Sequence, residues 1–155
     1  MNTIINKIQE LKKTKIKNII DNRIKEFKNL NKNSNDELFK ELCFCILTAN
    51  YNAEKTIKIQ KELGECFLQD TKEELAGKLR KSGHRFPDTR AAYIIESRKC
   101  RDSLKNVISF HDTNKLREWI VDNVKGLGYK ETSHFLRNIG FDDFAIIDFH
   151  IIDIL

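Results

Sequence analysis

Residues 121–150 read VDNVKGLGYKETSHFLRNIGFDDFAIIDFH, and this stretch decides the fold that we expect. It starts at the end of one amphipathic helical pattern and, after two glycines two positions apart, continues into a second one. Gly126 and Gly128 between two helices predict a tight hairpin whose backbone can take positive φ and leave amide N–H groups uncovered. Such amides beside a helix N-terminus bind a phosphate oxygen well, and Leu127 should anchor the hairpin in the core.

Two ionisable residues near this hairpin are candidates for chemistry. Lys130 lies at the start of the second helix, where the positive end of the helix dipole disfavours an ammonium and favours an amine nucleophile. Asp148 follows the apolar run at 144–147 and precedes a further helical turn, so we expect an N-cap that faces a cleft. An amine and a carboxylate beside a phosphate-binding hairpin suggest chemistry on a nucleic acid.

Four separated motifs then carry a family resemblance. KGLGYKETSHFLRNIG at 125–140, followed by FAIIDFH at 144–150, resembles the helix-hairpin-helix and aspartate signature of DNA glycosylase/AP lyases. ELCFCILTAN at 41–50, IQKELG at 59–64 and GHRF at 83–86 narrow the resemblance to the archaeal-type, second family of 8-oxoguanine DNA glycosylase/AP lyases. The motifs occur in the order that the family shows.

The resemblance implies a bifunctional enzyme of base-excision DNA repair that acts on double-stranded DNA containing oxidised guanine. Lys130 would attack C1′ of the sugar and form a Schiff base, Asp148 would stabilise the positive charge that develops, and β-elimination would cut the strand. The hairpin would hold the DNA backbone through Lys125, Gly126, Leu127 and Gly128. His134 and His150 could touch phosphate, although a packed or solvated histidine is the simpler interpretation of each.

The loop Gly83-His84-Arg85-Phe86-Pro87 is the second functional stretch. By the resemblance, His84, Arg85 and Phe86 would contact DNA, with Phe86 as the wedge that fills the vacated stack and Arg85 as the reader of the orphaned base. The alternative is that Phe86 packs onto the next helix, with Asp88 as its N-cap. Asn50, at the end of an apolar helix, is a candidate for the base pocket, and a polar helix C-cap is its alternative.

Composition sets the remaining limits. A net charge of +5 and a pI near 9.0 permit a polyanionic partner without requiring one. The four cysteines form neither a zinc pattern nor the closely spaced set that binds an iron–sulfur cluster, so we expect no metal and no cofactor. A hairpin of this kind can hold a monovalent cation on its carbonyls, which the sequence leaves open. Lacking a membrane span and a signal core, the protein is expected to be cytoplasmic and monomeric.

Elsewhere the chain also shows helical patterns. Residues 3–30 predict one or two packing helices with a break between Leu11 and Ile16. Capping boxes are expected at 34–37 and 71–74, and Thr113 or Asn114 should cap the first hairpin helix. The helix at 88–103 should carry its arginines outside, and 107–110 should connect it to the hairpin.

We therefore expect one all-α domain over residues 1–155, with two helical lobes, a DNA-binding cleft and the hairpin motif at about 115–140. Compared with the family, Phe149 stands in place of an arginine, and the C-terminal part of the family fold is expected to be missing. Two alternatives remain open: a truncated or degenerate, non-catalytic DNA-binding module, and a lyase of the same fold that acts on a different lesion.

Overall fold

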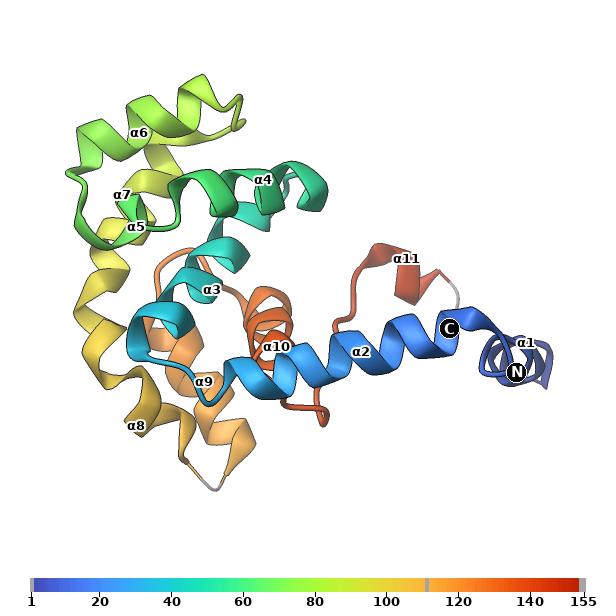
Figure 1. The fold of residues 1–155 in the computed structure, drawn as a ribbon. Coiled ribbons are helices and arrows are strands. Elements are labelled where there is room, and N and C mark those ends of the chain that lie inside the picture. The colour runs from blue at the N-terminus through green and yellow to red at the C-terminus, as the bar shows by residue number, and fades with distance from the viewer. Residues whose placement is uncertain (1, 111, 154–155) are drawn as a thin grey trace.

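The computed structural model describes residues 2–110 and 112–153, and every regular element in these ranges is a helix (Figure 1). In chain order the elements are α1 (Asn2–Leu11), α2 (Lys15–Leu30), α3 (Asn35–Thr48), α4 (Ala53–Leu63), α5 (Cys66–Gln69), α6 (Lys72–Lys81), α7 (Pro87–Ser97), the 3-10 helix η1 (Arg98–Ser103), α8 (Leu104–Ile108), α9 (Thr113–Asn123), α10 (Tyr129–Asn138) and α11 (Phe149–Ile152). Within the described residues, no helix has the length and apolar character needed to cross a membrane.

Helix α3 is the centre of the fold. Eight of its residues are buried, on all sides of the helix, because it packs against α4, α5, α7, η1, α8 and α10. In Figure 1, α4, α5 and α6 lie to one side of α3, and α8 and α9 lie to the other. The apolar run that the sequence places here is therefore the core that joins two groups of helices. The expected all-α architecture is confirmed.

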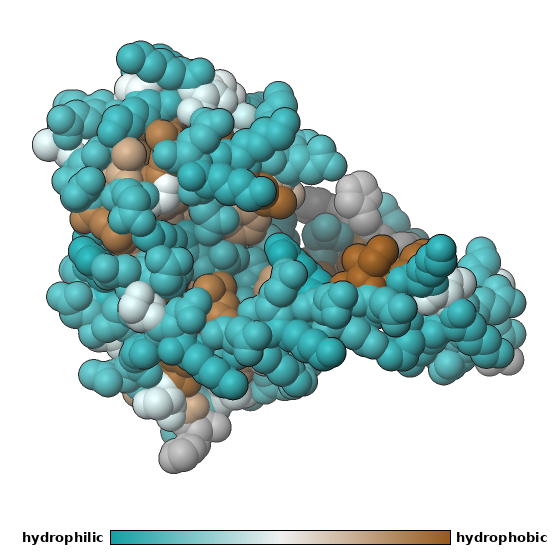
Figure 2. All heavy atoms as spheres, viewed as in Figure 1, coloured by the Kyte–Doolittle hydropathy of each residue, from teal (hydrophilic) through white to brown (hydrophobic). Residues whose placement is uncertain are grey.

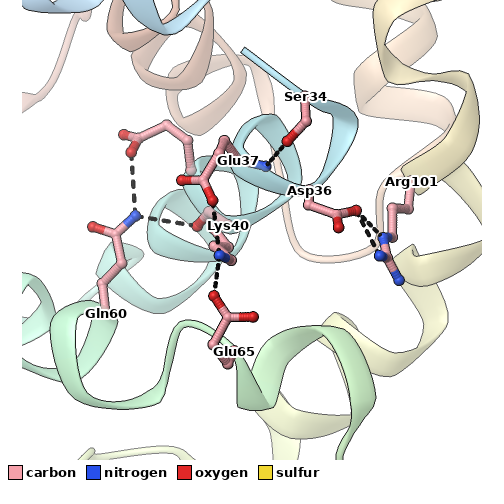
Figure 3. A network of polar contacts seen from close by, with 8 residues as sticks. Ser34, Asp36, Glu37, Lys40, Gln60, Glu65 and Arg101 are labelled. Carbon is pink, nitrogen blue, oxygen red and sulfur yellow. Dashed lines mark hydrogen bonds and ion pairs between the residues drawn. The ribbon is translucent and has the colours of Figure 1, made fainter.

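Side-chain caps fix where several helices begin. Thr71 and Glu74 form the complete capping box that the sequence predicts for α6. At α3, Ser34 accepts from the Glu37 N–H, but the Glu37 carboxylate pairs with Lys40 instead of completing the box (Figure 3). Lys40 also pairs with Glu65, which ties α3 to the segment before α5. These caps supply acceptors for first-turn amides that lack intrahelical partners.

Some predicted boundaries were wrong. Residues Leu104–Ile108 form α8 rather than a plain connection, because Leu104, Val107 and Ile108 turn one apolar face to the core. The N-cap of α9 is Asp112, whose carboxylate accepts from two first-turn amides, and not Thr113 or Asn114. The N-cap of α7 is Phe86 with a proline at the first helical position.

Helices α1 and α2 differ most from the prediction. The break between them is confirmed, since α1 ends at Leu11 and α2 begins at Lys15. The packing prediction is wrong: α2 has no buried residue, and the apolar face of the pair is exposed at Ile4, Ile5, Ile8, Leu11, Ile16, Ile19, Ile20 and Ile24. In Figures 1 and 2 the pair projects from the helical body, and hydrophobic surface gathers where it meets the segment around α11. Within α2, the apolar residues that are partly buried are Phe27 and Leu30, near its end, and Asp21 is the partly buried polar one.

Candidate active site

The hairpin between α9 and α10 has the predicted positive-φ backbone at its first glycine, Gly126. Gly126 has φ +87°, and a Cβ atom there would lie 2.3 Å from the ring of Tyr93, so the position excludes any side chain. Leu127 is 4% exposed and anchors the hairpin in the core, as predicted. Gly128 differs from the prediction, because its φ of −91° is open to any residue.

Gly128 matters as the N-cap of α10. It has no side chain to accept from the first-turn amides, and α10 accordingly has no side-chain cap. The Gly128 carbonyl accepts from Thr132, which begins the helical hydrogen-bond pattern. The N-terminus of α10 therefore presents amides and the positive end of the helix dipole to the surface, beside Lys130.

A cavity of about 620 Å³ lies next to this N-terminus. Its wall contains both residues that the sequence singles out for chemistry, Lys130 and Asp148. The loop residue Arg85 and the α3-end residue Asn50 line the same space. Segments far apart in the sequence thus bring four of the predicted site residues together.

Lys130 enters the cavity from the first turn of α10. Its side chain is 44% exposed, and its Nζ atom lies 3.5 Å from Oε1 of Glu131, whose side chain is only 20% exposed. Ion pairs at such exposure add little to stability, so this pair leaves the amine free to move. Lys130 is therefore a reachable amine with a carboxylate at hand.

Asp148 combines a structural contact with an open face. Its Oδ1 atom accepts from the Ile151 N–H at 3.1 Å, and its carbonyl accepts from the Ile152 N–H at 3.0 Å. These bonds make Asp148 the N-cap of α11, as predicted, while the side chain still lines the cavity. The side chains of Phe149 and His150, on which the sequence raised questions, lie outside the described part of the structure.

His134 lies one turn after Lys130 and also lines the cavity. Its ring packs edge-on against Phe44, with 5.8 Å between the centroids. Burial, together with the nearby Arg137 and Lys130 cations, lowers the pKa of His134 to about 4, so the imidazole is neutral at pH 7. The ring thus gives the cavity an uncharged polar surface between two cations.

The 83–87 loop is organised differently from the prediction at His84. That residue is 4% exposed; its Nε2 atom lies 3.0 Å from the Leu47 carbonyl, and its Nδ1 atom accepts from the Phe86 N–H. Burial also lowers the pKa of His84. With both of its nitrogens engaged inside the protein, the imidazole holds the loop in place rather than facing the cavity. The sequence could not show this, because the Leu47 carbonyl lies 37 residues away.

The two following residues stay available. Arg85 is exposed and lines the cavity, and its guanidinium lies over the Phe86 ring at 5.0 Å. Phe86 is partly exposed, so the structure leaves room for the predicted wedge as well as for packing. Asp88, the alternative N-cap, pairs with Arg80 at 2.7 Å instead.

Two polar residues lie at the C-terminal end of α3. Asn50 takes the left-handed backbone conformation, with φ +57°, directly after the helix C-cap Ala49, and it lines the cavity. Its place in the base pocket stays a prediction. Arg90, expected on the outside, is 8% exposed and donates to the Ala49 carbonyl at 2.6 Å. Arg98 likewise turns inward, to the Phe67 carbonyl at 2.8 Å.

Sequence reasoning missed Glu131 and Arg137 as cavity residues. A signal was available, because positions 130, 134 and 137 follow the spacing that places residues on one face of a helix. Among the described residues, no group of three or more histidine, cysteine or acidic side chains could hold a metal ion. All four cysteines are free thiols, and three of them are buried.

Comparison with known proteins gives one answer for the whole chain. The sequence profile of a family described as 8-oxoguanine DNA glycosylase matches residues 20–155. The 8-oxoguanine DNA glycosylase/AP lyase of Methanocaldococcus jannaschii is 56% identical over 149 residues, which are 96% of this chain and 72% of that protein. The protein of the same name from Korarchaeum cryptofilum is 50% identical, over 98% of this chain and 72% of its own length.

Solved structures agree. The crystal structure of the M. jannaschii 8-oxoguanine DNA glycosylase superposes with a TM-score of 0.94 at 55% identity and covers 97% of this chain, which spans 71% of that one. The crystal structure of the M. jannaschii 8-oxoguanine glycosylase/lyase in complex with a 15mer DNA containing 8-oxoguanine superposes with a TM-score of 0.93 at 54% identity. The match covers 97% of this chain and 73% of that chain. The predicted helix-hairpin-helix glycosylase fold is thus confirmed, and the chain belongs to the 8-oxoguanine DNA glycosylase family.

Proposed function

We propose that this protein is an 8-oxoguanine DNA glycosylase and AP lyase that acts in base-excision repair of duplex DNA. The single observation that carries the proposal is that Lys130 and Asp148, 18 positions apart, line one cavity beside the uncapped N-terminus of α10. Relatives with 50% identity or more over nearly all of this chain bear the same name.

DNA binding starts at the hairpin. The amides at the N-terminus of α10 and the positive dipole end suit a backbone phosphate, and Lys125 is exposed beside them. Arg85 lines the cavity and Phe86 follows it in the loop, so that a nucleotide leaving the stack would pass beside this loop. The exposed arginine and the partly exposed aromatic ring suit the space that the nucleotide vacates.

Chemistry would follow in the cavity. The neutral amine of Lys130 attacks C1′, and the bond between C1′ and the base nitrogen breaks with its electron pair going to the base, which takes up a proton. The Asp148 carboxylate stabilises the positive charge that develops on the sugar. Loss of a proton from the amine and opening of the sugar ring give an iminium ion. Removal of a C2′ proton then expels the 3′ phosphate, and water releases Lys130.

A non-catalytic DNA-binding module would need only the hairpin. It would not need an amine and a carboxylate in the wall of one cavity. It would also not need the Arg85 guanidinium and the neutral His134 imidazole that line the same cavity. The arrangement of these groups therefore favours the enzyme over the module.

The test is an assay of three duplexes side by side, containing 8-oxoguanine, uracil or a plain abasic site. We expect base release and strand cleavage on the first, cleavage on the third and neither on the second. Binding of all three without any cleavage would establish the module instead. Cleavage of the abasic duplex alone, without release of 8-oxoguanine, would mean a lyase for a different lesion.

A further inference from the structure

A partly buried chain of hydrogen bonds joins three helices and ends at the cavity. Gln60, on α4, donates through Nε2 to Oε2 of Glu41 at 3.2 Å and to the Lys40 carbonyl at 3.3 Å (Figure 3). Asn138, on α10 and 3% exposed, donates through Nδ2 to Oε1 of Glu41 at 2.5 Å. Its Oδ1 atom accepts from Nε of Arg137 at 3.1 Å and from Nη2 at 2.8 Å.

Holding the Glu41 carboxylate in this network costs desolvation free energy. Burial raises the pKa of Glu41, while the hydrogen bonds from Asn138 and Gln60 favour its ionised form. Buried polar groups of this kind rigidify what they hold more than they stabilise the fold. What they hold is the guanidinium of Arg137, the member of the chain that lines the cavity.

The guanidinium is fixed from two sides and open on a third. Asn138 takes the edge formed by Nε and Nη2, and the ring of Phe27, on α2, lies 5.3 Å from the guanidinium carbon. Within the described residues, Nη1 has no protein acceptor, and Arg137 as a whole is exposed. Seven positions separate Arg137 from Lys130, which places the two on one face of α10, about 10 Å apart along its axis.

We infer that Arg137 binds the extruded nucleotide, donating from its free edge to an oxygen of that nucleotide, and that Asn138 and Glu41 position it. The inference rests on the proposed function. The acceptor oxygen belongs either to a carbonyl of the damaged base or to a backbone phosphate, since a planar guanidinium suits both. In either case the nucleotide spans the cavity wall between Lys130 and Arg137.

The experiment compares Arg137→Ala and Arg137→Lys with the control Arg23→Ala. Arg23 is a matched control because its guanidinium lies over the same Phe27 ring, at 4.9 Å, but it is not among the residues that line the cavity. Single-turnover rates are measured over a range of enzyme concentrations on the 8-oxoguanine duplex and on the abasic duplex. We expect a loss of roughly 10- to 100-fold in the second-order rate constant for Arg137→Ala, and a substantial loss for Arg137→Lys, whose ammonium lacks the planar fork.

The two substrates separate the two acceptors. Loss on the 8-oxoguanine duplex alone assigns the bond to a base carbonyl, because the abasic site has no base, and loss on both assigns it to a phosphate. Millimolar methylguanidinium should restore part of the activity of Arg137→Ala and leave Arg23→Ala unchanged. An Arg137→Ala protein within twofold of the Arg23→Ala control on both duplexes overturns the inference alone. A wild-type protein that cleaves neither duplex overturns the proposed function, and this inference with it.

A double-mutant cycle tests the positioning role. Asn138→Ala should lower the second-order rate constant in the wild-type background and add little in the Arg137→Ala background, because it acts through the arginine. Glu41→Gln, which keeps the side-chain volume, should behave in the same way and guards against a misfolded Asn138 variant. Borohydride trapping measures the fraction of each protein preparation that is active, and each rate is divided by that fraction. A variant that only folds less completely then shows no loss of rate. Losses that multiply in full across the two backgrounds would exclude the positioning role.

Discussion

At the scale of single residues, Asp148 is both the N-cap of α11 and a negative charge in the cavity wall, and one substitution can separate these two roles. Its Oδ1 atom accepts from the Ile151 N–H, a bond that an asparagine oxygen makes equally well. The negative charge, by contrast, is lost in Asp148→Asn. The variant therefore distinguishes a carboxylate that stabilises a cationic sugar from one that only begins a helix.

We expect Asp148→Asn to slow base excision by roughly 10²- to 10⁴-fold, a range typical of losing a charge-stabilising or proton-transferring group, with the thermal unfolding midpoint nearly unchanged. Single-turnover release of 8-oxoguanine gives the rate, and thermal unfolding followed by circular dichroism checks the fold. A rate within a factor of three of wild type would reduce Asp148 to an N-cap.

His134 predicts a pH dependence of stability. Its pKa is about 4 in the folded protein and near the ordinary 6.5 in the unfolded chain, so the unfolded chain binds the proton first as pH falls. The contribution of His134 to the free energy of unfolding is therefore fully present above about pH 6.5 and is lost progressively toward pH 4. The whole contribution is on the order of 3 kcal/mol. Urea unfolding of wild type and His134→Gln between pH 4 and 7.5 should show a shallower slope for the variant. Parallel slopes would contradict the burial of a neutral imidazole.

At the scale of elements, the hairpin depends on a residue without a Cβ atom. Gly126→Ala meets both a φ of +87° and the Tyr93 ring at 2.3 Å, so it should destabilise the protein by about 1–3 kcal/mol and weaken DNA binding. Gly77→Ala is the matched control: Gly77 lies within α6 with nothing near its Cβ position, and alanine there should stabilise by roughly 0.5–1 kcal/mol. Denaturant unfolding measures both, and equal effects of the two substitutions would refute the hairpin geometry.

The exposed face of α1 and α2 makes a second prediction for elements. Ile19 is 68% exposed and Leu42 is fully buried, although both occupy apolar positions of helical patterns. Leu42→Ala should cost about 2–5 kcal/mol of unfolding free energy, whereas Ile19→Ala should change it by less than roughly 0.5 kcal/mol. Denaturant unfolding of the two variants measures both values. A cost above 1.5 kcal/mol for Ile19→Ala would mean that this face is covered in solution.

At the scale of the whole molecule, the sequence predicts best where the cause of structure is local. The turn at Gly126, the capping box at Thr71 and the cap at Asp148 each depend on neighbours within a few positions, and each appears as predicted. The burial of His84 and Arg90 depends on carbonyls of Leu47 and Ala49, 37 and 41 positions away, which no local pattern reveals.

The candidate site follows the same division. Its two central residues could be predicted from the motif that contains them. The glycine spacing and the helix start identify Lys130, and the position after an apolar run identifies Asp148. The rest of the wall, including Glu131 and Arg137, is defined only when α3, α10 and the 83–87 loop enclose a common space. Amphipathic spacing shows which face of a helix is apolar but not whether another element covers it, and for this reason the packing prediction for α1 and α2 was wrong.

The account depends most on a covalent bond between Lys130 and the sugar, and borohydride trapping on a duplex with 8-oxoguanine tests that bond most directly. Wild type should give a protein–DNA adduct of increased mass, and peptide mapping should locate the sugar on Lys130. Lys130→Gln should give neither an adduct nor strand cleavage while still binding the duplex. An adduct that forms at the wild-type level in Lys130→Gln, or that maps to another lysine, would contradict the account.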